Sequence, residues 1–329
     1  MIAAVLKNET QKVFKRRLAI LLLVVTAVIM LMTFGEFYLS GSAHITWQES
    51  VKNEIADYQR IVNGQAPSEW DGKLPTPAEA QRQIQVLQYH LDNNIPINGN
   101  DAGWFLADII NKDLALLMVL MIAYIAAETI AQESGEGTIK LLMTTPVPRW
   151  QVVLGKYASI MLTVTIVLAY TVILGYFTDG MLYGFGSLTQ NVILSPGISG
   201  ASIDMTISSH MPLWQYILSG TLLNWLSLAC VGALGMLFSA LLNNSGAAIG
   251  ATLGTVIGGQ VGLGVISKAN WPNYLFWKYL TPAANLPIDT NIPSGAQVSV
   301  TMTVAVLIIW ALIFIVSSMF VFEKKDILA

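Results

Sequence analysis

Six separate runs of about 20 apolar residues constrain this 329-residue chain more than any other feature of its sequence. They cover residues 18–39, 113–132, 153–177, 214–242, 245–266 and 299–322. A helix of about 20 residues crosses a hydrocarbon core of roughly 30 Å and satisfies its own backbone hydrogen bonds there. Only 11% of the residues are charged, against about one quarter in a soluble domain. The sequence therefore predicts an all-α integral membrane protein with six transmembrane helices.

Basic residues predict which side of the membrane each end of the chain occupies, because cytoplasmic segments carry an excess of Lys and Arg. They precede the first run and follow the last, at Lys7, Lys12, Lys15, Arg16, Arg17, Lys324 and Lys325. Residues 178–213 contain no Lys or Arg, so we expect an extracellular loop there. An even number of spans places both termini on the same side. The basic residues predict that this side, including the tail 323–329, is cytoplasmic.

Residues 1–17 mix apolar and basic side chains, which favours an amphipathic helix lying in the cytoplasmic interface. A plain basic anchor for the first span is the alternative. A removable signal peptide is a further alternative, but an apolar run of about 22 residues exceeds the usual 7 to 15 of such a peptide. We therefore expect residues 18–39 to be retained as the first transmembrane helix.

Residues 40–112 form the largest segment between two spans and are expected to be extracellular and helical. Trp47, Val51 and Ile55 recur at helical spacing, which predicts a first helix. Thr76 and Glu79 stand in the spacing of a capping box with a proline between them, which predicts the start of a second helix. The sequence thus predicts a small α-hairpin, serving either as a lid or partner-binding surface or as a packed cap.

The fifth span carries glycine at every fourth position, at Gly246, Gly250, Gly254, Gly258 and Gly262. Glycines on one helix face allow a second helix to approach closely, and van der Waals contact is the main attraction between helices in lipid. We call these five residues the glycine stripe and expect it to be a packing face, with a flexible conduit as the alternative.

Polar residues within the spans are few, and Thr163, Asn224 and Gln260 are weak candidates for a substrate path. Hydrogen bonding between helices is the alternative role for each. The three histidines are scattered without metal-ligand spacing, and Gly155-Lys156 lacks the upstream glycine of a phosphate-binding loop. We expect the chain to have no catalytic residues, to bind no metal or cofactor, and not to be an enzyme by itself.

Residues 267–298 hold a cluster of aromatic side chains interrupted by prolines. Trp and Tyr are enriched at membrane interfaces, so an interfacial belt on the outer side is one interpretation. A short re-entrant segment that dips into the membrane is the other.

Between the second and third spans, residues 133–152 form a short polar segment punctuated by glycine and proline. We call it the elbow. Such a segment lies at the membrane surface, and its Gly and Pro residues make it compact. With the charge pattern above, the elbow is expected to be a cytoplasmic docking surface.

The elbow resembles that of the type-two family of ATP-binding-cassette (ABC-2) permeases. The residues that carry this likeness are Glu133, Glu136, Gly137, Thr138, Leu141, Leu142, Pro146, Arg149 and, with Gly155, Lys156. The basic start, the six spans and the aromatic segment before the last span agree as well, so the resemblance covers nearly the whole chain. The extracellular helical pair departs from many compact members of the family.

The resemblance implies that the elbow is a coupling helix seated in a separate ABC ATPase subunit, which binds the ATP and Mg. The working unit would contain two ATPase copies and two permease chains in the lipid bilayer, the second permease being identical or related. Nucleic acid is not expected as a partner.

The implied function is export of an amphipathic substrate, such as a drug, peptide or lipid-like molecule, across the plasma membrane of a bacterium. One alternative is an ATPase-coupled protein that transmits force to an extracellular partner. A secondary transporter is disfavoured because the spans lack deep ionisable residues.

Overall fold

The structure is a computed structural model that describes residues 2–39, 46–65, 74–96, 101–110, 114–138, 148–199, 202–265, 271–282 and 299–325. The helices are α1 (Ile2–Leu39), α2 (Trp47–Val62), α3 (Pro77–Asp92), α4 (Ala102–Asp108), α5 (Ala115–Gly135), α7 (Arg149–Tyr183), α8 (Leu213–Leu241), α9 (Ser245–Val265) and α10 (Val300–Lys324), with short 3₁₀ helices η2 (Trp271–Tyr274) and η3 (Phe276–Tyr279). The strands are β1 (Asn191–Ser199) and β2 (Ser202–Pro212).

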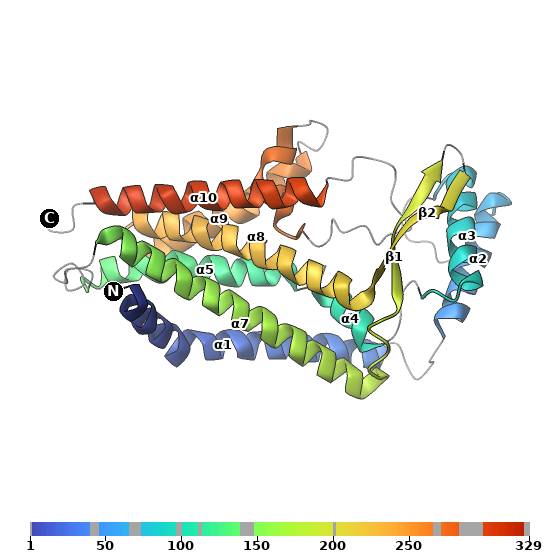
Figure 1. Cartoon of the computed structure of the whole chain (residues 1–329), viewed down its shortest axis with the longest axis horizontal. Coiled ribbons are helices and arrows are strands. Elements are labelled where there is room, and N and C mark those ends of the chain that lie inside the picture. The colour runs from blue at the N-terminus through green and yellow to red at the C-terminus, as the bar shows by residue number, and fades with distance from the viewer. Residues whose placement is uncertain are drawn as a thin grey trace.

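Six of the described helices, α1, α5, α7, α8, α9 and α10, are long and apolar enough to cross a membrane. They lie side by side along the long axis of the molecule (Figure 1). This arrangement confirms the predicted all-α fold with six transmembrane helices. Helix α7 extends beyond the predicted run 153–177 at both ends, because polar residues at a membrane surface can continue a helix.

The start of α1 and the end of α10 lie at one end of the bundle, which we call the terminal end (Figure 1). Helices α2 and α3 and both strands lie at the opposite end, which we call the cap end (Figure 1). Residues 2–17 are helical and continue directly into the first span, and the first turns of α1 run at an angle to the remainder (Figure 1). The terminal end also holds the last turn of α5 and the first turn of α7, which flank the elbow (Figure 1).

Helices α2 and α3 begin with the two capping boxes that the sequence contains. The Thr46 side chain accepts from the N–H of Glu49, and the Thr76 side chain accepts from the N–H of Glu79. The two helices pack through their own apolar cluster, which includes Val51, Ile55, Tyr58, Ala80 and Leu87. This small unit has a core separate from that of the bundle.

Two features at the cap end were not predicted. Residues 178–213, expected to be a loop, contain the antiparallel pair of β1 and β2, with register irregularities between Ile193 and Gly197. The strand β2 contacts α3, so the hairpin joins the helical pair. The short helix α4 is the second feature, and Asp101 caps it by accepting from the N–H groups of Gly103 and Trp104 at 3.0 and 3.2 Å.

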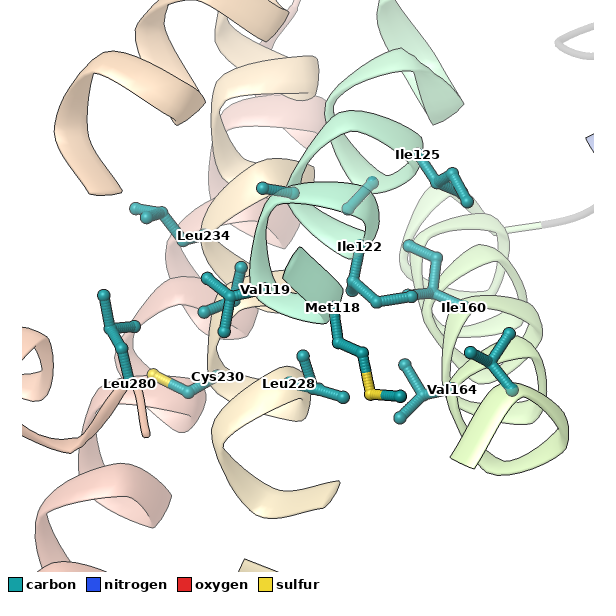
Figure 2. Close-up of a cluster of buried hydrophobic side chains, with 14 of the residues drawn as sticks. Met118, Val119, Ile122, Ile125, Ile160, Val164, Leu228, Cys230, Leu234 and Leu280 are labelled. Carbon is teal, nitrogen blue, oxygen red and sulfur yellow. The ribbon is translucent and has the colours of Figure 1, made fainter. Parts of the chain in front are cut away.

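The main core lies where α5, α7 and α8 meet (Figure 2). Figure 2 shows Met118, Val119 and Ile122 of α5 directed toward α7 and α8. The free Cys230 of α8 is fully buried in the same cluster, where it serves as a small apolar side chain.

Helices α5 and α8 approach each other closely at Gly235. A Cβ at this position would lie 2.7 Å from the Cβ of Ala126 and 3.2 Å from the carbonyl oxygen of Ala123. Small residues on both helices therefore form this seam, as expected for helices packed in lipid.

Residues 271–282 of the aromatic segment form what we call the wedge, which packs among three membrane-crossing helices. Its carbonyl groups accept from Ser227 Oγ of α8 at Leu280 (2.9 Å) and from Trp310 Nε1 of α10 at Tyr274 (2.9 Å). Its Trp277 Nε1 donates to the carbonyl of Thr255 in α9 at 2.8 Å. These contacts cover the irregular backbone of the wedge with protein, which is the condition under which such backbone is tolerated at membrane depth.

Candidate coupling site at the elbow

The described part of the elbow begins where α5 ends. The N–H of Glu136 donates to the carbonyl of Gln132 at 2.9 Å, and Gly137 then takes a φ of 73°. A positive φ ends the helix, and glycine adopts it without the steric cost that a Cβ brings. The hydroxyl of Thr138 donates back to the carbonyl of Glu133 at 3.4 Å. Three candidate residues, Leu141, Leu142 and Pro146, lie outside the described residues.

The first contact at the base of the elbow is a buried ion pair between α5 and α7. Lys156 Nζ lies 2.9 Å from Glu133 Oε2, and the Lys156 side chain is only 1% exposed. The same ammonium donates to the carbonyl of Thr129 at 3.2 Å. Glu128, earlier on α5, accepts from the hydroxyl of Tyr124 at 3.0 Å. The pair holds the last turn of α5 against the first turns of α7.

The second contact is made by Arg149, the first residue of α7. Its guanidinium donates to the carbonyls of Glu323 at 2.8 Å, Lys325 at 3.0 Å and Phe322 at 3.4 Å. These groups belong to the last turn of α10, whose carbonyls have no partner within the helix. The positive charge also suits the negative end of the helix dipole. Arg149 therefore caps α10, a role that the sequence did not predict.

The third contact joins the end of α10 to α8. Lys325 Nζ donates to the carbonyl of Ala240 at 2.8 Å. Burial lowers the pKa of this ammonium from its ordinary value, since removal of water disfavours the charged form. Nearby, the hydroxyl of Ser239 accepts from the N–H groups of Ile130 and Ala131 of α5, both at 2.8 Å. Helices α5, α7, α8 and α10 are thus linked at the terminal end.

An apolar cluster fills the space inside these polar contacts. Its buried members are Ile130, Val152, Val153, Met236, Ala240 and Phe322. They come from the same four helices as the polar contacts, and Phe322 is fully buried. The base of the elbow is therefore a packed unit, so a displacement of one helix end is resisted by the other three.

The glycine stripe of α9 faces away from the described remainder of the chain. A Cβ at Gly250, Gly254, Gly258 or Gly262 would meet nothing within 4 Å. The opposite face of α9 packs against α5, with Ala248 buried beside Ala127 and Ala131. With respect to the described residues, these four glycines therefore form an open surface, whereas a Cβ at Gly246 would lie 3.2 Å from Asn244 Oδ1.

The three polar candidates for a substrate path are dispersed. Thr163 Oγ1 donates to the carbonyl of Ser159 in its own helix at 2.9 Å, and Asn224 Nδ2 donates to the carbonyl of Ile110 at 2.6 Å. Gln260 lies half-buried on α9. Thr163 and Asn224 therefore make structural hydrogen bonds, and the structure does not bring the three into one site.

The residues that the structure describes contain no group of three His, Cys, Asp or Glu side chains that would hold a metal ion. At the terminal end, the base of the elbow is held to α5, α7, α8 and α10 by an ion pair and hydrogen bonds. Six apolar helices with such a segment define a multi-pass membrane protein of the permease type.

The model of the family described as "ABC-2 family transporter protein" matches residues 3–327. The chain therefore belongs to this family and is a membrane permease component of an ABC transporter, which implies an ABC ATPase subunit as a partner. The family assignment confirms the resemblance read from the elbow.

Two relatives from Bacillus subtilis (strain 168) match the chain. It is 24% identical to the protein YhcI over 327 residues, which cover 97% of both chains. It is 26% identical to the membrane protein YdbK over 216 residues, which cover 65% of this chain and 79% of YdbK. Similarity to YhcI thus extends over the cap-end segments as well as the spans.

Proposed function

We propose that this chain is the permease subunit of an ATP-driven exporter and that its elbow couples ATP hydrolysis by a separate ATPase to movement of an amphipathic substrate. The observation that carries this proposal is the network at the base of the elbow, in which a buried ion pair and a set of hydrogen bonds link the ends of four helices. An ATPase that pushes on the elbow needs a stiff connection to the spans, since a slack loop would absorb the displacement.

Arg149 and Lys156 are the central parts of this connection. Lys156 links α7 to α5 through Glu133, and Arg149 links α7 to the end of α10. A force applied at residues 133–152 is thereby transmitted to α5 and to α10 as well as to α7. Glu136, Gly137 and Thr138, together with Leu141, Leu142 and Pro146, are the proposed ATPase-facing residues.

The basic residues at both ends of the chain support a cytoplasmic terminal end and an extracellular cap end in a bacterial plasma membrane. The open glycine stripe supports a second permease chain packed against α9. The proposed working unit then contains two permeases and two ATPases, with ATP and Mg held by the ATPases.

A second candidate function is force transmission to an extracellular partner. The observation that favours it is the separate core of α2 and α3, which β2 contacts at the cap end. In this alternative the bundle moves the cap-end unit, and no substrate crosses the membrane.

Proteoliposomes that contain the permease and its ATPase test the proposal. Export predicts ATP-dependent movement of a fluorescent amphiphile, such as a dye-labelled phospholipid, out of the ATPase-side leaflet. A variant lacking residues 46–92 should retain part of this movement. Complete absence of movement in the intact complex, with ATP hydrolysis still responsive to an extracellular partner, would favour force transmission.

A further inference from the structure

The wedge reaches the middle of the membrane-crossing helices. Ser227, which binds the Leu280 carbonyl, is the central residue of α8 (Leu213–Leu241). Thr255, which binds the Trp277 indole, is the central residue of α9 (Ser245–Val265). Leu280 itself is 1% exposed and belongs to the same apolar cluster as Cys230 (Figure 2). The wedge is therefore inserted between helices rather than resting on the membrane surface.

Aromatic contacts fix the wedge in this position. The Phe276 ring lies 5.6 Å from the Trp310 ring and 5.4 Å from the Phe314 ring, centroid to centroid. The Trp277 indole rests over Gly259 of α9, where an added Cβ would overlap the ring. Because side chains of α8 and α10 and the main chain of α9 all bind the wedge, its residues have a defined depth in the bundle.

Lys278 is the charged residue of the wedge and stands between these anchors. Its Cα lies within about 8 Å of the Cα of Leu280, since consecutive Cα atoms are about 3.8 Å apart. Its side chain is half-buried, and its ammonium donates to Asn273 Oδ1. Tyr279 Oη in turn donates to the Asn273 carbonyl at 2.8 Å, which steadies the asparagine. In the described part of the chain, no carboxylate forms a salt bridge with Lys278.

A lysine at this depth is costly in hydrocarbon, and such residues generally face a protein-lined or hydrated path. The spans themselves place no other ammonium or guanidinium near the centres of α8 and α9 among their described residues. The neighbouring surface is apolar and aromatic, which suits the tail of an amphiphile. Gln260, the residue after Gly259, adds a half-buried amide on α9.

We propose that Lys278 recognises the anionic group of the transported amphiphile, so that the substrate class is an amphipathic carboxylate or phosphate. This inference rests on the proposed export function and specifies its substrate. The ammonium would bind the anionic group while the aromatic side chains of the wedge contact the apolar part. A charge-assisted hydrogen bond in a partly dry site is stronger than a neutral one and disfavours zwitterionic or neutral analogues.

Photolabelling of the full-length permease in nanodiscs tests this site without ATP hydrolysis. The probes are a photoactivatable fatty acid, a photoactivatable phosphatidylglycerol and the matching phosphatidylcholine, with labelled peptides located by mass spectrometry. Labelling within residues 271–282 by an anionic probe should exceed phosphatidylcholine labelling by about tenfold, because the choline ammonium of that zwitterion offsets the attraction between its phosphate and Lys278. Preference for the fatty acid or the phospholipid identifies the source of the anionic group.

Three variants complete the test. Lys278→Met should lose the anionic preference, whereas Lys278→Arg, which keeps the charge, should retain it. Lys52→Met, at an exposed lysine of α2, is the matched control and should behave as the wild type. Equal labelling by anionic and zwitterionic probes, or an unchanged preference in Lys278→Met, would overturn the proposal. A third outcome is that the anionic probes still label residues 271–282 but no amphiphile moves in an ATP-dependent way in proteoliposomes. That outcome would refute the export function and leave the anion-binding site at Lys278 standing.

Discussion

The ion pair between Lys156 and Glu133 places two charges at the base of the elbow, with the Lys156 side chain removed from water. Removal of one partner from a buried pair leaves the other charge without compensation and typically costs about 3–5 kcal/mol. Replacement of both partners by apolar residues of similar size is often nearly neutral. The pair therefore provides a sharp test of how the elbow is stabilised.

We predict that Lys156→Met and Glu133→Leu each lower the thermal stability of the purified permease. The double variant should recover most of the loss, which identifies the pair rather than either residue as the stabilising unit. Thermal unfolding of the four proteins in detergent measures this cycle. Additive losses in the double variant would contradict it.

Glu54 of α2 gives a prediction on pH at the cap end. Burial, together with the nearby Asp57 carboxylate, raises the pKa of Glu54 above its ordinary value of 4.5. The folded unit therefore binds a proton more tightly than the unfolded chain, so its stability is highest below the ordinary pKa. Stability falls as pH rises through the pKa of the folded state.

Glu54→Gln should therefore increase the protection of α2 amides from hydrogen exchange at about pH 7 and have little effect at about pH 4. Exchange rates corrected for the intrinsic effect of pH measure this difference in the full-length protein. An equal gain in protection at both pH values would exclude ionisation of Glu54 as the cause.

At the scale of elements, the seam between α5 and α8 depends on Gly235. The added side chain of Gly235→Val would overlap Ala126 and the α5 backbone, and overpacking of this kind costs about 1–3 kcal/mol or more. We predict a lower yield of folded protein and a lower unfolding temperature. Gly35→Ala is the control, because a Cβ at Gly35 meets nothing within 4 Å and should leave stability nearly unchanged. Equal stability of both variants would show that the seam is not tightly packed.

The six spans could be predicted because a bilayer requires each spanning helix to have a certain length and an apolar composition, and both can be read from the sequence. The capping box at Thr76 was predicted because it depends on residues three apart, whereas the box at Thr46, which has the same spacing, was not. Strand β2 was missed although Ile203, Met205 and Ile207 alternate with polar residues, a period typical of a strand. The absence of Lys and Arg from residues 178–213 predicts the side of the membrane but gives no information on strand structure.

Contacts between distant elements were beyond the reach of sequence patterns. Arg149 binds carbonyls about 175 positions away, and main-chain acceptors carry no residue signature. The depth of Lys278 could not be predicted, because this residue lies outside the continuous apolar runs and the wedge enters the bundle from between two of them. The depth of a residue follows from packing as well as from its position relative to a span.

At the scale of the whole molecule, the glycine stripe is an exposed surface on a helix whose other face is packed. We predict that it forms the seam between two permeases. Gly254→Cys should give a disulfide-linked pair of permeases in oxidised membranes, provided the two helices bring their Cα atoms within about 7 Å. Val316→Cys, on the exposed face of α10, is the control and should remain unlinked. Absence of a linked product at both Gly250→Cys and Gly254→Cys would exclude this seam.

The central claim is that the elbow docks on an ATPase and transmits its movement through Arg149 and Lys156. The most direct measurement is purification of the tagged permease in mild detergent, with the bound ATPase quantified by mass spectrometry and its hydrolysis rate determined. Gly137→Trp should lose bound ATPase, because the φ of 73° disfavours a bulky side chain and the indole would alter the docking surface. Gly137→Asn, which tolerates that φ, should retain it. Wild-type binding and hydrolysis in Gly137→Trp would contradict the account.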